Sequence, residues 1–164
     1  MGVSVNSAAK RIFRMIPIFK KYKNSDKAAI LAILAKNTPE YFHSDESTDL
    51  NNYLDNEIED YFVVEVNGKI IGSGGINYFS AASLARISWD VIDPNFHGQG
   101  WGKKIIEHRI SWIKEKAPEI QKIEVRTTQL THKFYEKMGF ELIKTEQNFW
   151  AEGFDLYQME MQLS

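Results

Sequence analysis

The chain has 164 residues, of which 43% are hydrophobic and 26% charged, and its formal net charge is −2. This length and composition are typical of one soluble globular domain with a substantial core. The chain has no cysteine, which excludes disulfides, zinc-thiolate sites and thiol catalysis. The near-neutral charge gives no general attraction to nucleic acid, and no apolar run is long enough to span a bilayer.

The segment 1–10 consists mostly of small and polar residues and lacks the apolar core of a signal peptide. We therefore predict a tail over residues 1–10, a single domain over residues 11–164 and a cytoplasmic location. An apolar run at residues 13–19 indicates the first strand.

Two helices are predicted next. Asn24 or Ser25 is a suitable N-cap for the first helix, and Pro39 ends that helix or bends its exit. The second helix is expected to begin at Ser47 or Thr48.

The dipeptide Asn67-Gly68 is the strongest hairpin signal in the chain, because both residues accept the positive φ angles of a type I′ turn. It joins strands that we predict at residues 61–66 and 69–76. The first strand alternates apolar residues that would form one buried face: Phe62, Val64 and Val66. The second contains glycines that would let another group pack close to it: Gly72, Gly74 and Gly75.

A strand expected at residues 86–92, with Ile87, Trp89 and Val91 as its apolar residues, leads into a glycine-rich turn. Three alternating glycines then precede a predicted helix: Gly98, Gly100 and Gly102. Glycine lets the backbone approach a ligand closely, and a helix start offers unpaired N–H groups and the positive end of the helix dipole. Together these features indicate a site for an anion, usually a phosphate.

The rest of the chain alternates strands and helices. The helix after the turn ends before Pro118, and a strand at residues 123–127 follows. A short helix at about residues 130–138 ends at Gly139, which fits a C-terminal cap. Two strands close the chain: residues 140–144 and 154–163.

Two segments resemble the GNAT acetyltransferases. The turn from Val91 to Lys104 is similar to that family's pyrophosphate loop, with His97 where Arg or Gln is usual. The segment Phe134-Tyr135-Glu136-Lys137-Met138-Gly139-Phe140 is similar to the family's tyrosine segment.

Between these segments, Ile123-Glu124-Val125-Arg126 resembles a strand of the family's protein N-terminal amine acetyltransferases. The family often has an Asn after this strand, where this chain has Thr127 or Thr128. The hairpin, the turn and the tyrosine segment occur in the family's order and cover roughly residues 60–142.

The resemblance implies an α/β (α+β) fold with a mixed, mostly antiparallel central sheet that is splayed at the cofactor site and flanked by about four helices. It implies acetyl-CoA as the co-substrate, and no metal is expected. The residues expected to bind this cofactor are Val91, Ile92, Gly98, Gln99, Gly100, Trp101, Gly102 and Lys103.

Acetyl transfer to an amine needs the neutral amine, so a carboxylate or a water that it orders should accept a proton. Glu124 is the first candidate because it matches the family's strand glutamate, and Asp90 is the second. By resemblance, Tyr135 would protonate the departing thiolate of coenzyme A, and the N–H of Val91 or Ile92 would stabilise the oxyanion. No covalent enzyme intermediate is expected.

The function predicted from these residues is an acetyl-CoA-dependent N-acetyltransferase for a small-molecule or peptide amine. The alternative is a non-catalytic acyl-CoA-binding or sensing module on the same fold. A nucleotide-binding module is disfavoured because the glycine spacing fits neither a P-loop nor a Rossmann turn. No nucleic acid or membrane partner is expected, and a homodimer is compatible with the sequence.

The acceptor is expected to be a cation, because residues 37–60 carry eight carboxylates and no Lys or Arg, whereas the rest of the chain is net positive. The eight are Glu40, Asp45, Glu46, Asp49, Asp55, Glu57, Glu59 and Asp60. The alternative reading is a solvated acidic surface, since acidic residues also suit helix N-termini.

Overall fold

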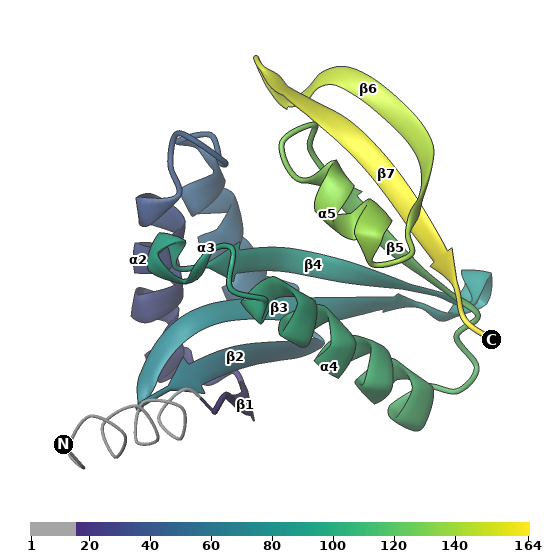
Figure 1. Cartoon of the computed structure of the whole chain (residues 1–164), viewed down its shortest axis with the longest axis horizontal. Coiled ribbons are helices and arrows are strands. Elements are labelled where there is room, and N and C mark those ends of the chain that lie inside the picture. Colours follow the sequence, from purple (N-terminus) through teal and green to yellow (C-terminus); the bar gives the residue numbers. More distant parts are fainter. Residues whose placement is uncertain (1–15) are drawn as a thin grey trace, which may run out of the picture.

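The computed structural model describes residues 16–164. The predicted tail and residues 13–15 of the first predicted strand lie outside this range. The described residues form a seven-stranded sheet in the order β1-β2-β3-β4-β5-β7-β6 (Figure 1). All neighbouring strands are antiparallel except β4 and β5.

The strands are β1 (Ile18–Lys21), β2 (Asp60–Val66), β3 (Lys69–Phe79), β4 (Leu84–Ile92), β5 (Lys122–Thr127), β6 (Glu141–Ala151) and β7 (Phe154–Gln162). The α-helices are α2 (Lys27–Lys36), α3 (Glu46–Asn56), α4 (Trp101–Lys116) and α5 (His132–Lys137). Short 3-10 turns occupy Asn24–Asp26, Ser80–Ala82 and Pro94–Phe96. None of the helices in this part of the chain is long and apolar enough to cross a membrane. The expected mixed, mostly antiparallel fold with four helices is confirmed.

The sheet is covered on both faces, because apolar residues occupy both sides of β2. Phe62, Val64 and Val66 pack in clusters with residues of α4, as the alternation predicts. Tyr61 and Val63 pack against α2 and α3. Figure 1 shows α2 and α3 side by side, apart from α4. We call these two sides the α4 face and the α3 face.

Strand β6 is much longer than the prediction of residues 140–144. It runs to Ala151, which pairs with Phe154 across the turn to β7. All its residues except Ala151 are exposed, because β6 is the edge strand of the described sheet. A strand with no buried face has no need of alternating apolar residues, so its polar residues 145–148 gave no strand signal.

The sheet is splayed between β4 and β5, as the resemblance implies. The two strands pair only over Leu84–Ile87 and Lys122–Val125. Beyond Ile87 they diverge (Figure 1), so the last five residues of β4 have no strand partner on that side.

A β-bulge at Trp89 interrupts β4. On β3, Ser73 pairs with Val91 and Gly75 with Ser88, so Gly74 faces two residues, Trp89 and Asp90. Trp89 has a φ angle of 49°, which is unusual for a bulky residue. A bulge adds one residue and reverses the alternation of side chains beyond it.

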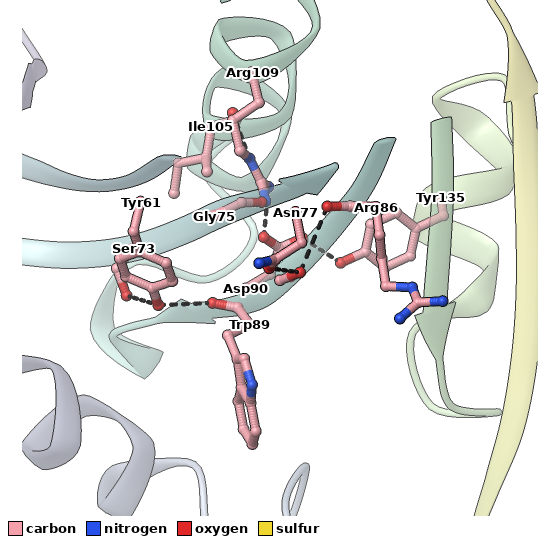
Figure 2. Close-up of polar contacts among 11 residues, drawn as sticks. Tyr61, Ser73, Gly75, Asn77, Arg86, Trp89, Asp90, Ile105, Arg109 and Tyr135 are labelled. Atoms are coloured by element: carbon pink, nitrogen blue, oxygen red, sulfur yellow. Dashed lines mark hydrogen bonds and ion pairs between the residues drawn. The ribbon is translucent and has the colours of Figure 1, made fainter. Parts of the chain in front are cut away.

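Because of this reversal, the apolar residues Ile87 and Val91 of the strand do not share one face. Ile87 packs in the cluster of the α4 face, whereas Val91 packs with α2 and α3. The hydroxyl of Tyr61 donates to the carbonyl oxygen of Trp89 at 3.0 Å and lies 3.0 Å from Ser73 Oγ. Tyr61 of β2 therefore links the bulge in β4 to Ser73 of β3 (Figure 2).

We predict that Tyr61→Phe lowers the free energy of unfolding by about 1–3 kcal/mol, because it leaves the buried carbonyl of Trp89 without this donor. Denaturant unfolding measures the change. The matched control is Tyr22→Phe, since the Tyr22 ring packs edge-on against Tyr61 and its buried hydroxyl has no hydrogen-bond partner among the described residues. Equal stability losses in the two variants would contradict the role given to the Tyr61 hydroxyl.

Candidate functional site

The three glycines of the turn before α4 are required for two different reasons. Gly98 and Gly100 have φ angles of +72° and +85°, in the left-handed region that favours glycine. Gly102 lies on the first turn of α4, where a Cβ would come within 3.0 Å of Phe134 and 3.2 Å of Ile92. The glycine turn therefore packs directly against these two side chains.

The start of α4 presents unpaired N–H groups. Gly100 is the N-cap and supplies no side-chain acceptor. The first backbone bond of the helix runs from Lys104 N to Gly100 O at 3.2 Å, and no bond from the N–H of Trp101, Gly102 or Lys103 occurs within the described residues. These donors and the helix dipole are the features on which the predicted anion site depends.

Two residues that the sequence reading did not single out for this role anchor the glycine turn. Asp93 is fully buried, accepts from Asn95 N at 3.0 Å and pairs with Lys36 at 3.0 Å. Burial alone would raise the pKa of Asp93, but these hydrogen bonds and the charge of Lys36 lower it. His97, which stands where the family usually has Arg or Gln, donates through Nε2 to Ile92 O at 2.9 Å.

One cavity of about 1060 Å³ joins the glycine turn to α3 and the open end of the β4–β5 gap. Its wall includes six of the eight residues expected to bind the cofactor: Ile92, Gly98, Gly100, Trp101, Gly102 and Lys103. The other two lie elsewhere: Val91 is buried in the α3-face core, and the Gln99 side chain donates to Asn95 O.

Asp90 and Tyr135 also line this cavity and contact each other. The Tyr135 hydroxyl donates to Asp90 Oδ2 at 2.5 Å. Burial, followed by the charge and hydrogen bond of Asp90, raises the pKa of Tyr135 well above its usual value. The phenol therefore keeps its proton throughout the physiological range.

A third residue, Arg109 of α4, completes this cluster (Figure 2). Its Nη2 lies 2.5 Å from Asp90 Oδ1, and its Nη1 donates to Gly75 O at 3.0 Å. The sequence reading missed Arg109. The available signal was its place on the apolar face of the helix, four residues after Ile105 and four before Ile113.

Glu124 does not reach the cavity wall. Its side chain is buried and pairs with Arg86 Nε at 2.8 Å. Of the two carboxylates considered as the base, the structure brings only Asp90 next to Tyr135.

The acidic segment divides into two groups. Four carboxylates line the cavity: Glu46, Asp49, Glu57 and Glu59. The other four do not; Asp55 pairs with Lys27 and Asp60 with Lys21. Burial raises the pKa of Glu46 above its usual value. We call the four cavity carboxylates the acidic wall.

The family model of the acetyltransferase (GNAT) domain matches residues 23–163. An uncharacterised N-acetyltransferase of Methanocaldococcus jannaschii is 31% identical over 87 residues. The aligned region is 49% of this chain and 38% of that relative, so the match spans well under two thirds of the relative's length.

Solved structures share the fold. A GNAT-family protein from Desulfovibrio desulfuricans superposes with a TM-score of 0.78 at 13% identity, covering 91% of this chain and all of the other. The N-acetylglutamate synthase of Neisseria gonorrhoeae, solved with coenzyme A and N-acetyl-glutamate, gives a TM-score of 0.72 at 17% identity. That match covers 91% of this chain and 35% of the synthase. With a family model that extends over nearly the whole described chain, and with the glycine turn, the splayed sheet and the cavity tyrosine in place, this protein belongs to the GNAT acetyltransferase family.

Proposed function

We propose that this protein transfers the acetyl group of acetyl-CoA to a primary amine by direct attack within a ternary complex. The observation that carries the proposal is the continuous cavity that joins the unpaired N–H groups at the start of α4 to the Asp90–Tyr135 pair. A screen of acetyl-CoA turnover against peptides, polyamines and aminoglycosides tests it. Binding of acetyl-CoA without turnover of any amine would favour the non-catalytic acyl-CoA-binding module.

The cofactor site that we propose follows from the shape of the cavity. The N–H groups at the start of α4 would bind the pyrophosphate, and Lys103 on the cavity wall would add positive charge. The pantetheine arm would enter the gap between β4 and β5, where β4 has no strand partner. Members of the GNAT family use acetyl-CoA in general, and one structural neighbour was solved with coenzyme A bound.

Three groups would carry the chemistry. Tyr135 is the proposed acid for the departing sulfur, since its hydroxyl is protonated and lies on the cavity wall. Asp90 is the proposed base because it alone of the two candidates reaches the cavity, with Glu124 as the alternative. The N–H of Val91 or Ile92, on the part of β4 that has no strand partner on the β5 side, is the proposed oxyanion donor.

The acceptor that we propose is a cationic amine, because the acidic wall faces the same cavity. Carboxylates concentrated on one wall attract a cation and raise its local concentration. Trp89 and Trp150 lie on the wall as well and offer ring faces that a cation can contact.

We predict that Gly100→Glu weakens coenzyme A binding by at least ~100-fold, or about 2.8 kcal/mol, in isothermal titration calorimetry. The new carboxylate would repel the pyrophosphate at the helix start. The matched control is Gly68→Glu, because Gly68 has a similar φ angle of +74°, has open space around it and lies outside the cavity wall. Unchanged affinity in a folded Gly100→Glu variant would remove the glycine turn from the cofactor site.

Tyr135→Phe should lower kcat by roughly ten- to a thousand-fold and change acetyl-CoA affinity only several-fold. The reason is that the phenylalanine keeps the packing of the ring and loses only the proton donor. Steady-state kinetics and calorimetry measure the two quantities. Near wild-type turnover would reduce Tyr135 to a packing role.

The acidic wall predicts a salt effect. For a cationic amine, kcat/KM should fall several-fold as ionic strength rises from about 0.01 M to 0.15 M, because the Debye length falls from about 30 Å to 8 Å. The fall should be smaller in Glu46→Gln/Asp49→Asn. Asp55→Asn is the control, since Asp55 pairs with Lys27 outside the cavity wall. A salt-independent rate, or a neutral or anionic best acceptor, would make the acidic wall ordinary surface.

A further inference from the structure

Arg109 is a charged residue with no solvent exposure at all. A buried guanidinium is costly unless its donors find partners. Nε donates to Ile105 O at 3.3 Å and Nη1 to Gly75 O at 3.0 Å, and Nη2 faces Asp90. Uncharged backbone acceptors alone would leave the charge unpaired, so Asp90 is the counter-ion that makes the burial tolerable.

Two features of the sheet make room for this ion pair. A Cβ at Gly74 would come within 2.6 Å of Asp90 Oδ1 and 2.9 Å of Arg109 Cζ, so only glycine leaves the space. Ile87 packs on the α4 face, so regular alternation would direct Asp90, three residues later, to the opposite face. The bulge at Trp89 reverses the alternation beyond it, and Asp90 therefore lies on the α4 face as well.

Asp90 uses its two oxygens differently. Oδ1 is buried and lies 2.5 Å from Arg109 Nη2 without hydrogen-bond geometry. Oδ2 accepts the hydroxyl proton of Tyr135, and the side chain as a whole keeps 19% of its surface exposed. The carboxylate is thus fixed on one side and open to the cavity on the other.

The buried tyrosines around the Asp90–Arg109 pair remain neutral near pH 7. Tyr61 of β2 and Tyr53 of α3 both interact electrostatically with this cluster. Burial raises the pKa of Tyr61, and it raises the pKa of Tyr53 to about 12. A guanidinium stays charged at any pH that proteins tolerate. None of Tyr53, Tyr61, Tyr135 and Arg109 therefore changes its charge near neutrality.

We propose that Asp90 and Tyr135 form one proton relay from the attacking amine to the departing sulfur, and that buried Arg109 is the positioning residue that holds Asp90 in it. This inference rests on the proposed acetyl transfer.

The protons balance in this relay. The neutral amine nitrogen forms the N–C bond, and the positively charged nitrogen that results gives one proton to Asp90 Oδ2. The C–S bond breaks, the sulfur takes the phenolic proton of Tyr135, and the phenolate takes the proton held by Asp90. Both residues return to their starting states, and the net transfer is one proton from nitrogen to sulfur.

The relay avoids a step that Tyr135 alone would find difficult. A thiol has a pKa of about 8.5, whereas the pKa of Tyr135 is raised well above 10 by burial and by Asp90. Proton donation that left a phenolate beside the Asp90 carboxylate would be strongly uphill. Immediate return of a proton from Asp90 removes that intermediate.

The kinetic test compares Arg109→Met, Arg109→Lys, Asp90→Asn and the double variant Asp90→Asn/Arg109→Met. Arg109→Met should lower kcat at least ~10-fold and leave the KM for acetyl-CoA within about threefold. The acidic limb of its pH profile should move to higher pH, because a carboxylate that loses a neighbouring cation is protonated more readily. Arg109→Lys should restore part of kcat, since it keeps the charge but loses the planar fork.

The double variant isolates the action of Arg109 through Asp90. If Arg109 acts only by holding Asp90, adding Arg109→Met to Asp90→Asn changes kcat little. Ile113→Val is the packing control, because Ile113 is a buried residue of the same helix outside the cavity wall. Additive losses, or a wild-type pH profile in Arg109→Met, would overturn the proposal.

Two further measurements complete the test. The first does not require Arg109→Met to fold, and the second does not require turnover. Gly74→Ala should lower kcat by forcing Asp90 and Arg109 apart while keeping both charges. Titration of Tyr135 by NMR with 13Cζ-labelled tyrosine should show a lower pKa in Asp90→Asn than in wild type. The variant lacks the negative charge and the carboxylate hydrogen bond that raise the pKa of Tyr135. An identical titration in the two proteins would refute the relay. Failure of the wild type to acetylate any amine would refute the proposed function alone.

Discussion

The extra residue at Trp89 in β4 decides which side chains meet in this protein. Before the bulge, Ile87 packs on the α4 face; after it, Val91 packs on the α3 face. Asp90 consequently lies on the same side as Arg109 and Tyr135. The left-handed φ angle at Trp89 costs free energy, and the hydrogen bond from the Tyr61 hydroxyl to the Trp89 carbonyl offsets part of that cost.

The polar cluster next to the bulge is stabilised by its connections rather than by any single contact. A buried ion pair repays its desolvation only when its remaining donors and acceptors are satisfied. Arg109 donates to two backbone carbonyls, and Asp90 accepts from the Tyr135 hydroxyl. Loss of Asp90 or Arg109 would leave the other as an unpaired buried charge, whereas loss of the Tyr135 hydroxyl would remove a hydrogen bond from Asp90.

Local signals in the sequence predicted the elements that depend on neighbouring residues. Asn67-Gly68 identified the β2–β3 hairpin, and the alternating glycines identified the start of α4, because turn and helix-start geometry are set within a few residues. The bulge, the full length of β6 and the ion pair of Arg109 were missed. The bulge and the ion pair each depend on a residue more distant in the chain: Gly74 opposite Trp89, and Asp90 beside Arg109. Strand β6 pairs with its neighbour in the chain, β7, but it has no buried face that would impose an apolar alternation. Asp90 was named as a base from its place on the strand, but its pairing with Arg109 could not be read from spacing.

The two ends of the cavity are built from separate parts of the chain. The glycine turn lies between β4 and α4, whereas the acidic wall comes from α3 and the loop before β2, some 40 residues earlier. Substitutions in α3 can therefore change the charge and shape of one end while the backbone of the other end stays as it is. Under the proposed function, the end that binds the acceptor can therefore diverge under selection while backbone geometry preserves the end that binds the cofactor.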